Sequence, residues 1–222
     1  MIQSPLLVEK KREALTQGLL ALGEEVATAL SKSLEALRTQ DLALAREVVD
    51  GDASINLARR ILEQEALLAL AAYQPAGSDL RRIAASLELV AELERIGDYA
   101  ADVARILLRK EWDQLPGNLT AGIAQMGDAA LGMCRDALRA FTREGGDETL
   151  ARAVVARDDQ VDALQRAALD AVVDLIRDHP AVAAPALALS WIAHYYERVA
   201  DRATNIAERV VYLATGEIPD LN

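Results

Sequence analysis

Ten side chains with oxygen ligands recur in a regular pattern along the chain. In each of four segments, two or three acidic or amide side chains stand four residues apart. Because residues four apart lie on one face of an α-helix, each set forms a row of oxygen atoms. The rows are Asp52 and Asn56; Glu94, Asp98 and Asp102; Asp158 and Asp162; and Glu197, Asp201 and Asn205. We call the rows at 94–102 and 197–205 the first and second carboxylate ridges.

Such rows have two interpretations. Ligand sets made only of oxygen suit Mn, Mg, Ca or iron better than Zn or Cu, so two facing rows would hold a divalent or ferric ion. In an acidic chain, however, most such pairs lie on solvated faces, where Arg95 or Arg198 could hold them in surface ion pairs. The same acids recur in both halves beside apolar residues, and this recurrence favours metal binding.

Other chemically active residues are sparse. His179 precedes a proline at a helix end, His194 is expected on a helix surface, and Cys134 is expected in the core. The sequence contains no Glu-x-x-His pair, no glycine-rich phosphate loop, no Gly-x-Ser-x-Gly turn and no Cys-x-x-Cys pair. A metal-carboxylate enzyme stays open as an alternative, but the sequence offers it no separate general base.

Six long helices must position the ridges. The composition is 52% apolar and only 4% aromatic, which favours helices over strands, and apolar residues recur at spacings of three and four. The predicted helices span about 4–38, 41–73, 78–112, 118–143, 147–178 and 181–215. Their predicted N-terminal capping residues are Ser4, Asp41, Ser78, Asn118 and Asp147.

The chain consists of two similar halves. Residues 94–104 are echoed by 197–207, and 48–56 are echoed by 154–162. Short connections force successive helices to pack antiparallel. The sequence therefore predicts an all-α fold of two tandem, pseudo-symmetric three-helix bundles, similar to spectrin repeats. The predicted bundles are residues 1–113 and 118–222, joined by a linker at 113–117.

Charge and composition exclude several classes of function. With 24 Lys and Arg against 35 Asp and Glu, the net charge of −11 opposes binding to nucleic acid or to an anionic membrane. The single cysteine and the absence of an apolar leader predict a cytoplasmic protein. The uncharged stretch 181–196 is too short for a transmembrane helix and contains Pro185, so no membrane span is expected.

Several linked motifs resemble the PhoU family across nearly the whole chain. The two segments Glu94-Arg95-Ile96-Gly97-Asp98 and Glu197-Arg198-Val199-Ala200-Asp201 are similar to the paired signatures of that family. The turn at 74–81 and the C-terminal stretch at 204–217 are similar as well. This sequence departs from the pattern at Ala200, which replaces a glycine, and at Asn56, which leaves the first site one charge poorer.

The resemblance implies a function without catalysis. Proteins of this family regulate phosphate uptake as adaptors between a Pst-type phosphate ABC transporter, through its ATPase subunit, and a PhoR-type sensor kinase. They restrain the phosphate-starvation response when phosphate is abundant, and some hold clusters of metal ions. We therefore expect a homodimer that reaches the membrane only through its partners and binds one or more iron, Mn or Mg ions. A metal-free helical scaffold is the third alternative.

The expected ligands divide into two groups. Primary ligands are Asp52, Glu94, Asp98, Asp158, Asp162, Glu197 and Asp201, and secondary ligands are Asn56, Asp102 and Asn205.

Overall fold

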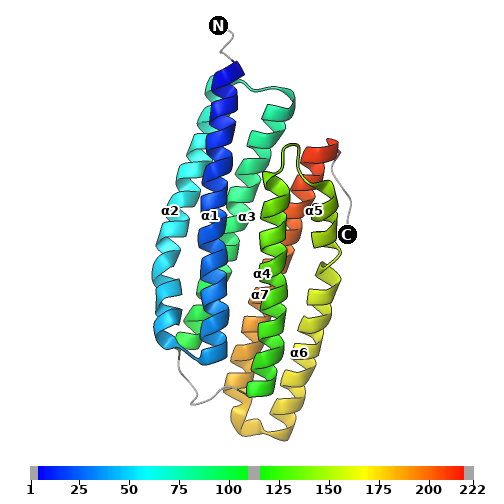
Figure 1. The fold of residues 1–222 in the computed structure, drawn as a ribbon. Helices are drawn as coiled ribbons and strands as arrows, with labels where there is room; N and C mark the ends of the chain where they lie inside the picture. The colour runs from blue at the N-terminus through cyan, green and yellow to red at the C-terminus, as the bar shows by residue number, and fades with distance from the viewer. Residues whose placement is uncertain (1–4, 110–115, 218–222) are drawn as a thin grey trace.

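The computed structural model describes residues 5–109 and 116–217, and these form seven α-helices and one short 3-10 helix. The first half contains α1 (Pro5–Thr39), α2 (Leu42–Tyr73) and α3 (Gly77–Leu108). The second half contains α4 (Gly117–Thr142), α5 (Glu148–Val155), α6 (Asp158–Asp178), the 3-10 helix η1 (Pro180–Val182) and α7 (Ala183–Thr215). Figure 1 shows two adjacent antiparallel bundles, which confirms the predicted all-α fold.

Local sequence sets several helix ends. Asp41 caps α2 by accepting hydrogen bonds from the Ala43 and Leu44 amides at 2.8 and 3.1 Å. Asp147 caps α5 in the same way, by accepting from the Leu150 amide at 3.0 Å. At the other end of the second half, α7 ends at Gly216, whose left-handed φ of 77° is one that glycine adopts without steric cost.

Two predicted N-terminal caps are wrong. Ser78 lies inside α3, which starts one residue earlier because Gly77 makes the turn with a φ of 58°. Asn118 likewise lies inside α4, and its side chain accepts only from the adjacent Leu119 amide. The predicted cap Ser4, the predicted helix end near Trp112 and residues 113–115 of the linker lie outside the described residues.

The predicted helix 147–178 is interrupted. A turn at Ala156 and Arg157 separates α5 from α6. Arg157 leaves the helix to reach α4, where it donates to the Asp136 carboxylate at 2.9 Å and to the Ala129 carbonyl at 3.3 Å. Gly132 leaves room for this guanidinium, since a Cβ there would lie 2.7 Å from its Nη2. As a result, Asp158 is the first residue of α6 rather than a mid-helix residue.

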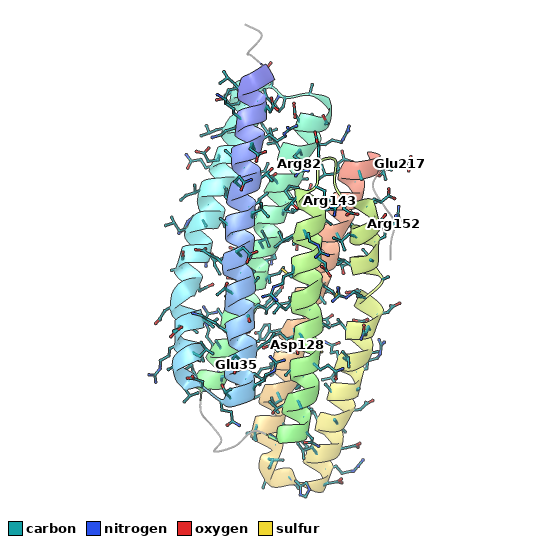
Figure 2. The ribbon with its side chains drawn as sticks, viewed as in Figure 1. Glu35, Arg82, Asp128, Arg143, Arg152 and Glu217 are labelled. Atoms are coloured by element: carbon teal, nitrogen blue, oxygen red, sulfur yellow. The ribbon has the colours of Figure 1, made fainter. Side chains whose placement is uncertain are left out.

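The two halves pack on each other through α1, α3, α4 and α7. Figure 1 places α2 and α6 at the two outer sides, and buried apolar residues from both halves belong to one continuous core. Arg82 of α3 reaches across to α4, as Figure 2 shows beside Arg143. Its guanidinium donates to the carbonyls of Arg143 and Phe141 at 3.0 and 2.7 Å and lies 4.4 Å from the centroid of the Phe141 ring.

None of the helices within the described ranges is long and apolar enough to cross a bilayer. The stretch 181–196 belongs instead to η1 and the first half of α7, where Leu189 and Ile192 are fully buried in the protein core.

Candidate metal centre

The two carboxylate ridges lie on α3 and α7, which pack against each other in an antiparallel orientation. Tyr99 of α3 stacks on Tyr195 of α7 with ring centroids 5.9 Å apart. Glu92 precedes Tyr99 in α3, and its carboxylate pairs at 3.2 Å with Arg202, which follows Tyr195 in α7. Because the contacts run in opposite order along the two helices, the helices are antiparallel. Figure 1 shows α3 and α7 next to each other behind α1 and α4.

The first ridge, on α3, faces Asp52 of α2. Burial, together with the negative charges of Glu94, Asp52 and Asp102, raises the pKa of Asp98 from its usual 3.8 to about 6. The four acids are thus close enough to repel one another, as the prediction of facing rows requires. Gly97 allows this approach, since a Cβ there would lie 3.0 Å from Ile55 of α2.

Two arginines neutralise part of this charge. Arg105 binds Asp52 of α2 at 3.0 Å and Asp102 of α3 at 2.7 Å, so one guanidinium bridges the two rows. Arg59 of α2 lies 3.9 Å from Glu94. The internal repeat places Glu208 where the first half has Arg105, so this bridge is a feature of the first ridge only.

The second ridge, on α7, faces Asp158 and Asp162 of α6. Burial, together with the nearby charges of Asp201, Asp162 and Asp158, raises the pKa of Glu197 from its usual 4.5 to about 7. Burial also raises the pKa of Asp158, although the Thr204 hydroxyl donates to this carboxylate at 3.2 Å and opposes the shift. The four predicted primary ligands of this half therefore share one electrostatic environment.

Basic groups also border the second ridge. Arg198 donates a hydrogen bond to Asp201 three residues later on α7, as the surface ion-pair interpretation expects. In the first half the corresponding contacts come from Arg59 and Arg105 instead of Arg95. His194 lies on the exposed side of α7, with its Nδ1 atom 3.6 Å from Glu197 Oε2.

Two buried carboxylate oxygens have no hydrogen-bond donor within the described residues. These are Asp52 Oδ1 on α2 and Glu197 Oε2 on α7, one for each ridge. A buried acceptor without a partner costs about 1–3 kcal/mol, and more when it is charged. A bound cation would give these oxygens a partner and offset the repulsion among the acids, so the chemistry of both ridges fits a metal ion.

The side chains do not form a closed ligand shell. Within the described residues, no three His, Cys, Asp or Glu side chains are gathered in a way that could hold a metal ion. At the first ridge, Arg105 occupies one oxygen of Asp52 and one oxygen of Asp102. Binding of a metal would therefore require these two side chains to exchange their contacts with Arg105 for contacts with the ion.

The predicted secondary ligands have other partners. Asn56 donates to the backbone carbonyl of Asp52 at 3.0 Å. Asn205 donates to Glu92 of α3 at 3.4 Å, across the boundary between the two halves. Asp102 accepts a hydrogen bond from the Tyr195 hydroxyl in addition to its bond with Arg105. Asn205 and Asp102 thus connect different helices, whereas the Asn56 bond stays within α2, and the role of all three as ligands stays a prediction.

Sequence reasoning missed three residues that shape the site. Arg105 stands three residues after Asp102, a spacing that already indicates an ion pair on one helix. Thr204 and Tyr195 gave no such signal, because each acts on an acid of another helix. Their contacts depend on how α7 packs against α6 and α3.

The fold and the site define a class of all-helical proteins with two repeats and one carboxylate ridge on each. The family profile described as the PhoU domain matches residues 19–107 and 123–210 of this chain. The chain therefore belongs to the PhoU family.

Relatives of this chain carry the description phosphate-specific transport system accessory protein PhoU homolog. The one from Pseudomonas aeruginosa is 36% identical over 206 residues, covering 92% of this chain and 84% of the relative. The one from Streptococcus pneumoniae is 33% identical over 208 residues, covering 94% and 95%.

Solved structures agree with this assignment. The phosphate transport system regulatory protein PhoU from Streptococcus pneumoniae superimposes with a TM-score of 0.87 at 31% identity, covering 96% of this chain and 99% of the other. PhoU from Pseudomonas aeruginosa superimposes with a TM-score of 0.90 at 33% identity, covering 94% and 99%.

Proposed function

We propose that this protein regulates phosphate uptake and phosphate-starvation signalling as a non-enzymatic adaptor. It connects the ATPase subunit of a Pst-type phosphate ABC transporter with a PhoR-type sensor kinase and represses the phosphate regulon when phosphate is abundant. The observation that carries the proposal is the similarity, over both repeats and nearly the whole chain, to accessory proteins of the phosphate-specific transport system. Long helical faces also suit an adaptor, which needs extended surfaces for its partners.

We further propose that the ridges bind iron, Mn or Mg ions. The electrostatic repulsion around Asp98 and Glu197 and the orphaned oxygens of Asp52 and Glu197 support this assignment. A bound cation would neutralise the acids and connect α2 to α3 in one half and α6 to α7 in the other. The primary ligands would be Asp52, Glu94 and Asp98 in the first half, and Asp158, Asp162, Glu197 and Asp201 in the second.

The cellular setting follows from the same proposal. An adaptor that joins a transporter ATPase to a kinase works in the cytoplasm and reaches the membrane through these partners. A homodimer would present two copies of each docking surface, which strengthens attachment to a dimeric partner by avidity.

Metal content tests the ligand assignment. The protein is purified without a metal-chelating tag, incubated with iron or manganese, and analysed by mass spectrometry of its metals. We expect bound metal in the wild type and loss of metal in a variant with four ridge acids replaced by alanine. A matched control replaces four exposed acids and should keep its metal. The ridge variant changes Glu94, Asp98, Glu197 and Asp201, and the control changes Glu35, Asp50, Asp170 and Asp174.

Complementation tests the regulatory function. The gene is deleted in its host, and expression of a phosphate-regulated reporter is measured in phosphate-rich medium. We expect derepression in the deletion strain and restored repression when the wild-type chain is supplied. Unchanged reporter expression after deletion would overturn the proposed function, whatever the result for metal.

A further inference from the structure

A cavity of about 560 Å³ opens between the C-terminal part of α3 and the N-terminal half of α7. It lies at the junction of the two halves, next to the first ridge, and it combines apolar walls with charged side chains. The residues that matter here are Arg105 and Ile106 from α3, Arg109 directly after it, and Leu187, Trp191 and Tyr195 from α7.

Large apolar side chains are exposed at this cavity. Trp191 and Leu187 expose 56% and 52% of their surface, one helical turn apart on α7. His194 lies 6.0 Å from Trp191 and 5.9 Å from Tyr195 between ring centroids, and Tyr195 stacks on Tyr99. In a chain with only 4% aromatic residues, this group forms a continuous and well-supported aromatic surface. Exposed tryptophan on such a support is typical of the residues that dominate protein interfaces.

The charge of the cavity differs from the charge of the chain. Asp102 and Arg105 of α3 line the cavity paired with each other, whereas Arg109, which directly follows α3, is exposed and makes no ion pair within the described residues. In the described part of a chain with a net charge of −11, the Arg109 guanidinium thus lies beside exposed aromatic surface without an acidic partner. The C-terminus of a helix favours arginine, but that preference does not account for the exposed Trp191 and Leu187 on the facing helix.

We propose that this cavity docks a partner protein through an acidic segment. An apolar side chain of the segment packs between Leu187 and Trp191, and a neighbouring carboxylate binds Arg109. Tryptophan, tyrosine and arginine are the three residue types most enriched among interface hot spots, and all three line the cavity. A free inorganic anion would use Arg109 but would leave the apolar walls exposed, so the combination favours a peptide. The inference rests on the proposed adaptor function, for which it identifies one docking surface.

A peptide titration tests the cavity directly. The probe is a fluorescent ten-residue peptide in which aspartate alternates with leucine, and binding is measured by fluorescence anisotropy. We expect Trp191→Ala and Arg109→Glu each to weaken binding by about 30-fold, the loss typical of a hot-spot residue. The matched controls are Leu67→Ala, which is 53% exposed on α2, and Arg46→Glu, which is exposed on the same helix. Both controls should bind within twofold of the wild type.

Two further arms identify the chemistry. Replacing every aspartate of the peptide by lysine should abolish binding, and raising the salt concentration should weaken it. Inorganic phosphate at about 1 mM should not displace the peptide, since its affinity for one exposed arginine is expected to be weaker than that. Equal binding by wild type and both cavity variants, or absence of peptide binding at about 1 mM, would overturn the proposal.

Binding to the ATPase subunit of the phosphate transporter separates this inference from the proposed function. If the wild type and both cavity variants bind the ATPase equally, and bind the kinase equally, the cavity is not the docking surface and the adaptor function stands. If deletion of the gene leaves phosphate repression intact, the adaptor function fails, and the peptide titration still decides whether the cavity binds acidic segments. Loss of peptide and partner binding in the cavity variants, with binding kept in the controls, supports the proposal.

Discussion

Replacing Glu197 by glutamine should stabilise the metal-free protein at alkaline pH. Burial and three nearby acids raise the pKa of this side chain from 4.5 to about 7. Because the folded-state pKa is above the unfolded value, the folded protein is penalised wherever the group ionises. The penalty is absent below pH 4.5, grows between pH 4.5 and about 7, and is constant above that. Glutamine removes the charge and keeps the size of the side chain.

The size of the effect follows from the pKa shift. A shift from 4.5 to about 7 corresponds to about 3 kcal/mol of lost stability, at about 1.4 kcal/mol for each pH unit. The site is partly open to water, which screens the interactions, so we expect a net gain on the order of 1 kcal/mol. For a chain of 222 residues this corresponds to an increase of about 2–4 °C in Tm.

Urea unfolding with a metal chelator measures this gain at pH 5 and at pH 8. Glu197→Gln should be more stable than the wild type at pH 8 and nearly equal to it at pH 5. Asp170→Asn removes an exposed acid of α6 and should change the stability little at either pH. With manganese in place of the chelator the order should reverse at pH 8, because the wild type gains binding energy. A variant that is destabilised equally at both pH values would refute the electrostatic argument.

Three other substitutions test separate features. Arg105→Ala should lower the stability of the metal-free protein by about 1 kcal/mol. It should also strengthen manganese binding about tenfold in calorimetric titrations, because the guanidinium that competes for the carboxylates is removed. Weaker manganese binding would contradict this competition. Arg82→Ala should cost about 2 kcal/mol in urea unfolding by leaving two carbonyls of α4 without a donor, whereas Arg139→Ala on the exposed face of α4 should cost under about 0.5 kcal/mol. Gly127→Ala should cost about 1–3 kcal/mol, because its Cβ would lie 2.3 Å from a leucine methyl of α1. As its control, Gly122→Ala should stabilise α4 by up to about 1 kcal/mol, because a Cβ at this position would meet no atom within 4 Å.

The architecture was predictable from the sequence because its determinants are local. Helical periodicity, the caps at Asp41 and Asp147 and the internal repeat indicate the order and the lengths of most helices. The break between α5 and α6 was not predictable, since residues 147–178 form one continuous helical pattern. It depends on Arg157, whose guanidinium binds Asp136 of α4 and lies against Gly132, where a side chain would block it. A contact of this kind leaves no trace in local spacing.

The candidate site was also predictable only in part. Four-residue spacing places Glu94 and Asp98 on one face of α3, and the repeat indicates that Asp52 of α2 lies opposite. Periodicity alone could not show that α3 and α7 pack side by side, and this packing directs Asn205 to Glu92 instead of into the second ridge. The acids of the site were therefore predictable, whereas the groups that compete for them were not.

Arg105 belongs to both proposed sites, and this makes them interdependent. In the metal-free protein its guanidinium is held by Asp52 and Asp102, on the ridge side of the cavity between α3 and α7. A cation that takes these two carboxylates releases Arg105, which then stands beside Arg109 and adds a second positive charge for an acidic partner. By linkage, a metal that strengthens peptide binding must itself be bound more tightly when the peptide is present, by the same factor. Peptide titrations with and without manganese measure that factor. Arg105→Ala should abolish it, and a coupling that persists in this variant would show that the two sites communicate by another route.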